Sequence, residues 1–305
     1  MMYEVQNAVD ELLGIVSPPY FGKTIDKNIL RPIGYVAFVV TLFLIVLGLL
    51  IKRRWLAITG SVALYLPTFG YFAFTMWTLF GGIGVLRILW FPLLDLSPNT
   101  LELGNIVYWP FLIVSFLLLP LLFVTTGRNS LYLYELLPLS DVIMAFGLAI
   151  LFLGVFTWLY GKFKGYQIID FWIYRYSRHP QYLGYIMWSY GFLINTLLGP
   201  HPFSDRCLPP PSLPWLISTL IIIGVALHEE NIMASVYGEK YIKYREKTPF
   251  IIPFPRKLAA LVNVPTRILF KKKRPENGKE IIVTLLFYAI ILILLSICFP
   301  TIFST

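Results

Sequence analysis

The chain is poor in cysteine and in charge. Its 305 residues include two cysteines, and 13% of the residues are charged against 57% that are hydrophobic. Cys207 and Cys298 have no spacing typical of a metal site, and we expect no disulfide framework from them. A soluble domain carries about a quarter charged residues, so the composition excludes an ordinary soluble protein. Residues 1–32 contain acidic side chains and no long apolar core, so we expect no cleavable signal peptide there.

Long apolar runs make up much of the chain, whose mean hydropathy is +0.72. A helix needs about 20 predominantly apolar residues to cross a bilayer. Seven runs approach this length, and an eighth, 85–96, is short and contains Arg87 and Asp95. We therefore predict an all-α fold, a polytopic transmembrane helical bundle with seven or eight spans. The seven strong runs are 33–51, 55–80, 106–125, 142–160, 183–198, 215–227 and 281–299.

Positive charge is concentrated beside the apolar runs. Of the 25 lysines and arginines, twelve lie between Lys240 and Lys279, and four more lie in the segment 161–181. Basic residues that flank spans favour the cytoplasmic side and anionic lipid headgroups. We therefore expect both segments at the cytoplasmic face, membrane lipids as partners and no nucleic-acid partner. Three strong runs lie between the basic residues 52–54 and residue 161, which would put these two segments on opposite faces. Either 85–96 also crosses the membrane, giving eight spans, or the short basic stretch 52–54 violates the rule, and we favour eight spans.

Two polar clusters interrupt the apolar pattern. The first is residues 178–184, Arg-His-Pro-Gln-Tyr-Leu-Gly, and the second is residues 228–230, His-Glu-Glu. Two apolar runs joined by a proline-rich turn separate the clusters, so we expect a hairpin whose ends return to one membrane face. Pro180 disfavours helix at His179, and Gly184 allows another backbone or a ligand to come close. The sequence therefore predicts one polar site built from both clusters.

The second cluster continues as a helix. Spacings of four and three place one row of side chains on a single face, while Glu230 projects about 100° away from Glu229. Gly238 softens this helix, and Pro249 ends it. The row consists of Glu229, Met233, Tyr237, Tyr241 and Tyr244. Tyrosines in such a row are also typical of an aromatic belt at the membrane interface, and both interpretations stay open.

These motifs resemble the C-terminal signature of the isoprenylcysteine carboxyl methyltransferase and phospholipid methyltransferase superfamily. That signature is Arg-His-Pro-x-Tyr-x-Gly, then Glu-Glu, Phe/Tyr-Gly, Tyr-x-x-Tyr and two prolines, and the resemblance covers residues 165–255. The matching residues are Arg178, His179, Pro180, Tyr182, Gly184, Glu229, Glu230, Tyr237, Gly238, Tyr241, Tyr244, Pro249 and Pro253. Family members often have Gly-Pro-Tyr-Arg before the first motif, where this chain has Trp172-Ile173-Tyr174-Arg175.

The resemblance implies an integral-membrane methyltransferase that uses S-adenosylmethionine, has its active site at the cytoplasmic face and requires no metal. A lipophilic acceptor would reach the site from the bilayer. The implied catalytic residues are Glu229, Glu230 and Arg178, and the implied cofactor-binding residues are His179, Pro180, Tyr182, Gly184, Tyr174, Glu229, Tyr237 and Tyr241. The chain then divides into an N-terminal interfacial segment (1–32), a variable transmembrane region (33–160), the cofactor-binding core (161–255), a basic linker (256–280) and a C-terminal transmembrane helix (281–305).

Two other functions compete with this interpretation. Sterol-type membrane reductases share the Arg-His-Pro-x-Tyr-x-Gly turn and use it with a nicotinamide cofactor, but they usually have a cysteine before Tyr-Gly, where this chain has Ser235. Transporters usually contain repeated halves, and the sequence shows no internal repeat. We interpret the basic run 271–274 as an interface anchor. The sequence does not determine the acceptor, the role of the last helix or the oligomeric state.

Overall fold

The computed structural model describes residues 31–51, 56, 59–60, 91–126, 136–198, 212–253 and 264–298, and the secondary structure in these ranges is helical, without a strand. In chain order the elements are α2 (Arg31–Leu50), α5 (Phe91–Leu96), η3 (Pro98–Tyr108), α6 (Trp109–Thr126), α7 (Leu137–Phe163), η5 (Trp172–Arg175), α8 (Pro180–Leu198), α9 (Ser212–Lys247), α11 (Val264–Phe270) and α12 (Gly278–Cys298). The predicted all-α class is confirmed for this part of the chain.

Within the described residues, four helical stretches are long and apolar enough to cross a membrane. They are Thr100–Leu118, Leu137–Phe163, Ser212–Lys247 and Gly278–Cys298, and the shorter apolar stretch Pro32–Gly48 accompanies them. These helices fit an integral membrane protein. The count of seven or eight spans stays a prediction, because most of the run 55–80 and the first half of 85–96 lie outside the described residues. The predicted run 215–227 is the middle of a longer helix, α9, which extends beyond it at both ends.

Helices α7 and α8 pack backbone against backbone. Each has glycines seven residues apart, Gly147 and Gly154 on α7 and Gly184 and Gly191 on α8. A Cβ atom on Gly184 would overlap the backbone nitrogen of Leu151 and lie 2.7 Å from the carbonyl oxygen of Gly147. Small residues that let helices approach closely are typical of membrane helix interfaces. The contact holds the first turn of α8, and the polar residues that precede it, beside α7.

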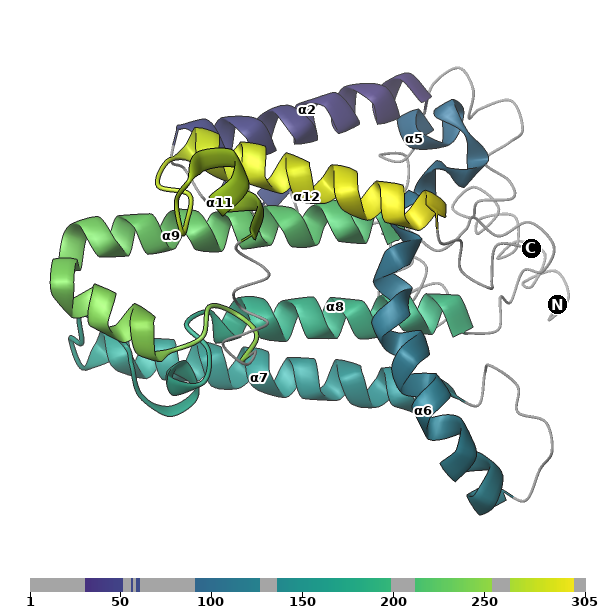
Figure 1. Ribbon diagram of the computed structural model, residues 1–305, viewed down its shortest axis with the longest axis horizontal. Helices are drawn as coiled ribbons and strands as arrows, with labels where there is room; N and C mark the ends of the chain where they lie inside the picture. The colour runs from purple at the N-terminus through teal and green to yellow at the C-terminus, as the bar shows by residue number, and fades with distance from the viewer. Residues whose placement is uncertain are drawn as a thin grey trace, which may run out of the picture.

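Helix α9 lies in the middle of the bundle, with α8 on one side and α12 on the other (Figure 1). At its start, the Ser212 hydroxyl lies 2.9 Å from the carbonyl oxygen of Leu101 and 2.7 Å from Asn105 Oδ1, both in η3. These polar contacts satisfy groups that are removed from water, as buried hydroxyls and amides require. The apolar core around them includes Tyr108, Phe111, Leu193, Ile194, Trp215, Leu216 and Ile281.

A sharp bend divides α9 at Gly238. The backbone there has φ 52° and ψ −133°, which is close to the mirror image of the first central position of a type II turn and favours glycine. Beyond the bend, α9 turns back beside the ends of α7 and α8 (Figure 1). The Tyr244 hydroxyl then donates a hydrogen bond of 2.8 Å to the carbonyl oxygen of Tyr174. The bend thus places the last part of α9 over the polar segment that leads into α8.

Candidate functional site

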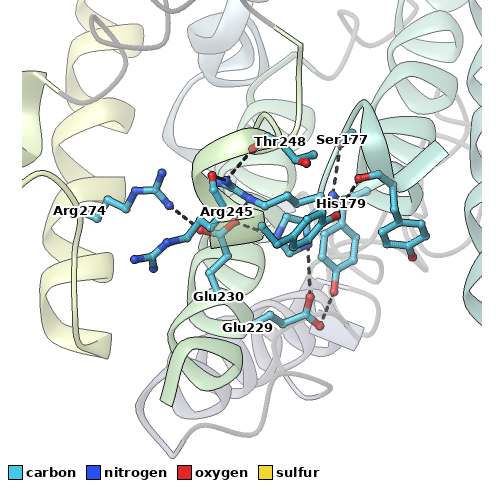
Figure 2. A network of polar contacts seen from close by, with 11 residues as sticks. Ser177, His179, Glu229, Glu230, Arg245, Thr248 and Arg274 are labelled. Atoms are coloured by element: carbon cyan, nitrogen blue, oxygen red, sulfur yellow. Dashed lines mark hydrogen bonds and ion pairs between the residues drawn. The ribbon is translucent and has the colours of Figure 1, made fainter. Parts of the chain in front are cut away.

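The two polar clusters meet, as the hairpin predicted. His179 Nδ1 lies 3.6 Å from Glu229 Oε2, and His179 Nε2 lies 3.5 Å from Glu230 Oε1. Neighbouring residues on a helix point in different directions, and the imidazole occupies the space between these two carboxylates (Figure 2). One ring therefore faces both acidic side chains of α9, each through a different nitrogen.

Local backbone structure explains the position of His179. The residue immediately precedes α8, and its carbonyl oxygen accepts the hydrogen bond of the Leu183 amide at 3.0 Å. Its own amide donates to Ser177 Oγ at 3.2 Å. Pro180 occupies the first helical position, where its missing N–H leaves no donor unsatisfied. The predicted interruption of the helix at His179 is confirmed.

Aromatic rings hold the imidazole on two sides. The Tyr182 ring stacks on it with centroids 5.5 Å apart and planes 13° apart. The Phe250 ring meets it edge-on, with centroids 5.3 Å apart. Phe250 also faces the Arg178 guanidinium at 5.7 Å. The sequence did not single out Phe250, because a phenylalanine after a proline in an apolar chain carries no signal of its own.

Arg178 joins three segments of the chain. Its Nη1 donates to the carbonyl oxygens of Arg245 and, at 2.7 Å, Thr248. Its amide donates to the Pro249 carbonyl oxygen at 3.0 Å, and its Nε forms an ion pair with Glu230 Oε1. The last carbonyls of a helix lack partners within the helix and attract cations. Arg178 thus caps the end of α9, and a catalytic role for it stays a prediction.

The two glutamates differ in exposure and in partners. The Glu230 side chain is 2% exposed and pairs with two arginines, Arg178 through Oε1 and Arg274 Nη1 through Oε2 at 2.9 Å. The Glu229 side chain is 17% exposed, and its Oε1 accepts a hydrogen bond of 2.9 Å from the Tyr182 hydroxyl. Glu230 is consequently the internal carboxylate of the pair, neutralised by arginines, and Glu229 is the more exposed one.

The tyrosines predicted to line the site are not equivalent. Tyr174 and Tyr241 are buried, and the rings of Tyr241 and Tyr244 are 5.9 Å apart. Burial raises the pKa of the Tyr174 phenol, and the nearby Glu229 carboxylate raises it further, so this phenol is protonated at neutral pH. No hydrogen bond, ion pair or ring contact within the described part of the chain connects Tyr237 to the cluster.

Gly184 serves the contact with α7. The space that a side chain would need is filled by backbone atoms of Gly147 and Leu151, so of the two close approaches predicted for Gly184, the helix backbone is the one observed. Pro180, also predicted to bind a cofactor, is buried at the start of α8. Cofactor contacts at these two positions stay predictions.

Arg274, like Phe250, is a residue of the cluster that sequence reasoning missed. It belongs to the basic run 271–274, which we interpreted as an interface anchor, yet its guanidinium pairs with the buried Glu230 (Figure 2). Nothing distinguishes Arg274 from its basic neighbours in the sequence, and only the packing of the chain reveals the pair. Within the described ranges, no group of three His, Cys, Asp or Glu side chains could hold a metal ion.

Comparison with known proteins adds one finding. Residues 99–248 match the model of a protein family of unknown function, DUF1295. No curated protein and no solved structure matches the chain. The match names neither a methyltransferase nor a reductase. The chain is therefore similar, from η3 to the end of α9, to a family without an assigned function, and the matched region includes both polar clusters but stops before Arg274.

Proposed function

We propose that the protein is an integral-membrane methyltransferase that transfers a methyl group from S-adenosylmethionine to a lipophilic acceptor at the cytoplasmic face. The observation that carries the proposal is the arrangement of His179 between Glu229 and Glu230, at the point where α8 begins beside the membrane helices. The basic residues that flank the site support the cytoplasmic orientation, because such residues favour that side.

The donor set fits a cationic, ring-containing ligand. When bound, S-adenosylmethionine supplies an electrophilic methyl group on a sulfonium, together with an ammonium, a carboxylate and an adenine. Glu229 is partly exposed and accepts a hydrogen bond from the Tyr182 hydroxyl, which suits it to attract a cation. Tyr182 and Phe250 provide flat rings close by, and adenine stacks on such rings.

The chain's own part in methyl transfer would be positioning. Methyl transfer is an in-line displacement, which depends on holding the two reactants in line and on excluding water. An acceptor carboxylate needs no base. An acceptor amine must lose a proton, and Glu229 is the carboxylate within reach for that step. A prenylated cysteine carboxylate, a lipid amine and an isoprenoid or quinone-type lipid are all acceptors that fit the proposal.

A nicotinamide-dependent reductase is the second candidate, and one contact favours it. The Tyr182 hydroxyl bonded to Glu229 is a pair that could donate a proton after hydride transfer. However, nicotinamide dinucleotides carry several phosphate charges and need free cations. The Arg178 and Arg274 guanidiniums are already paired with Glu230. This pairing favours S-adenosylmethionine, which carries a positive charge, over a nicotinamide dinucleotide.

Calorimetry with purified protein separates the two candidates. We expect stoichiometric binding of S-adenosylmethionine and none of NADPH. Glu229→Gln should weaken the binding at least tenfold, which corresponds to about 1.4 kcal/mol. Glu239→Gln is the matched control, because Glu239 is an exposed glutamate on the same helix. Stoichiometric binding of NADPH without binding of S-adenosylmethionine would reverse the ranking.

The acceptor can be identified by product analysis. The protein is incubated with methyl-labelled cofactor and a total membrane extract, and the label is traced into lipid and protein fractions. His179→Ala, which removes the imidazole from between the carboxylates, is the inactive reference. Label in lipid indicates a lipid acceptor, and label in protein indicates a prenylated-cysteine acceptor. Equal labelling by the wild type and His179→Ala would contradict the proposal.

A further inference from the structure

The segment that connects α11 with α12 docks against the centre of the candidate site. Two successive residues of α9 contact two successive residues of this segment. Glu230 Oε2 pairs with Arg274 Nη1 at 2.9 Å, and Asn231 Nδ2 donates to the carbonyl oxygen of Pro275 at 3.0 Å. We call residues 271–277 the 271–277 link. Its position follows from specific contacts with α9 and not from charge alone.

The link is built onto the first turn of α12. The amide of Glu280 donates to Asn277 Oδ1 at 2.9 Å, and Glu280 Oε2 accepts from the amide of Glu276 at 2.7 Å. This arrangement resembles a capping box, which fixes the start of a helix, except that the carboxylate binds the amide of the residue before Asn277. Lys272 Nζ adds contacts of 2.6 Å to Glu276 and 3.0 Å to Glu280. Arg274 is therefore presented by an ordered turn.

The charges of the cluster explain why a second arginine matters. A carboxylate as buried as that of Glu230 requires partners for both oxygens. Arg178 forms an ion pair with Oε1 from the α8 side, and Arg274 donates a hydrogen bond to Oε2 from the α12 side. The two arginines thus hold this turn of α9 from opposite directions. The adjacent residue, Glu229, keeps its contacts with His179 and Tyr182 only while that turn stays in place.

We propose that Arg274 is a positioning residue of the candidate site, which acts through Glu230 to hold Glu229 against His179 and Tyr182. The inference rests on the proposed function for its ligand-binding test. Helices α11 and α12 lie beyond the residues matched by the family model. The inference assigns these two C-terminal helices a part in forming the site.

A double-mutant cycle tests the route through Glu230. Arg274→Gln should weaken S-adenosylmethionine binding about tenfold, which corresponds to about 1.4 kcal/mol. In a Glu230→Gln background the same change should have little further effect, because coupled residues do not act additively. Lys273→Gln removes the same charge from an exposed neighbour and should leave the affinity unchanged. Arg274→Lys should recover part of the affinity. Additive losses, or an equal loss in Lys273→Gln, would overturn the proposal.

A ligand-free measurement separates failure of this inference from failure of the proposed function. Hydrogen exchange is compared for peptides that cover residues 178–184 and 228–232 in the wild type, Arg274→Gln, Arg274→Lys and Lys273→Gln. We expect faster exchange in both peptides for Arg274→Gln, partial recovery for Arg274→Lys and no change for Lys273→Gln. If the wild type binds no S-adenosylmethionine, the proposed function fails while this result still decides the positioning role. Unchanged exchange in Arg274→Gln would contradict it.

Discussion

Arg178, just before α8, and Glu230, on α9, form an ion pair in which each side chain is 2% exposed. A buried pair of this kind adds little net stability compared with an apolar replacement, but removing one partner leaves an uncompensated charge. The pair also connects the carbonyls at the end of α9 to the start of α8, since Arg178 bonds to Thr248 as well. The site therefore depends on this contact for its shape.

Arg178→Ala should destabilise the protein strongly. The substitution removes the ion-pair partner of Glu230 Oε1 and the donor to the carbonyl oxygens of Arg245 and Thr248. Loss of one partner of a buried pair costs about 3–5 kcal/mol, and we expect the lower end of this range because Arg274 still pairs with Glu230 Oε2. Thermal or denaturant unfolding in detergent measures the change. Arg175→Ala, at an exposed arginine in the same segment, is the control and should be close to neutral. Equal stability of the two variants would contradict the structural role of Arg178.

Tyr182→Phe should affect ligand binding more than folding. The variant keeps the ring that stacks on His179 and loses only the hydroxyl that donates to Glu229. A typical hydrogen bond contributes about 0.5–1.5 kcal/mol, and we expect a smaller loss here because Glu229 is partly exposed. Affinity for S-adenosylmethionine should fall several-fold, since the Glu229 carboxylate loses one of the contacts that hold it in place.

Tyr185→Phe is the matched control for that experiment. Its hydroxyl is buried and has no hydrogen-bond partner among the described residues. Removal of an unsatisfied buried hydroxyl is neutral or stabilising. We expect unchanged ligand affinity and an unfolding free energy equal to or above that of the wild type. A larger loss of affinity in Tyr185→Phe than in Tyr182→Phe would contradict the assigned role of the Tyr182–Glu229 contact.

The meeting of His179 with Glu229 could be predicted from the sequence. Two apolar runs joined by a proline-rich turn bring their polar ends to one face, and Pro180 marks where the first cluster interrupts the regular helix. Both patterns can be seen in the sequence itself, from the positions of its charged residues and prolines. The expected stripe from Glu229 to Tyr244 holds only as far as Gly238, where the bend redirects the later tyrosines.

The pairing of Arg274 with Glu230 and the packing of Gly184 against α7 could not be predicted in this way. Arg274 lies in a run of four basic residues, and such runs are typical of membrane interfaces. Its pairing with Glu230 depends on how α12 packs against α9, which no local pattern encodes. Likewise, Gly184 permits the approach of either a ligand or a helix, and only the position of α7 shows that a backbone fills the space.

Gly184→Ala should separate α7 from α8. The new methyl group would overlap the backbone nitrogen of Leu151 and lie 2.7 Å from the Gly147 carbonyl oxygen, and backbone atoms of two packed helices cannot give way cheaply. Overpacking costs about 1–3 kcal/mol. Because α8 begins next to His179, ligand affinity should fall with stability. Unfolding and calorimetry on the same preparation measure both.

Gly224→Ala provides the comparison for Gly184→Ala. A methyl group there would meet Leu285 Cδ1 at 2.5 Å, which is the end of a flexible side chain that can rotate away. We expect a smaller loss of stability and an unchanged ligand affinity. A loss in Gly224→Ala as large as that in Gly184→Ala would show that the backbone contact between α7 and α8 has no special importance.

Gly238→Ala tests the bend in α9. A Cβ atom at this position would have no neighbour within 4 Å, so any cost comes from the backbone conformation, φ 52° and ψ −133°. Such conformations cost a residue with a side chain about 1–3 kcal/mol. We expect lower stability and faster hydrogen exchange across residues 241–248, because a straighter α9 would carry Tyr244 away from the Tyr174 carbonyl. Glu239→Ala, at the exposed next residue, should change neither. Arg178 caps the end of this same segment. Exchange that stays slow in Gly238→Ala would therefore mean that the Arg178 cap, and not the glycine, holds the last part of α9 in its position.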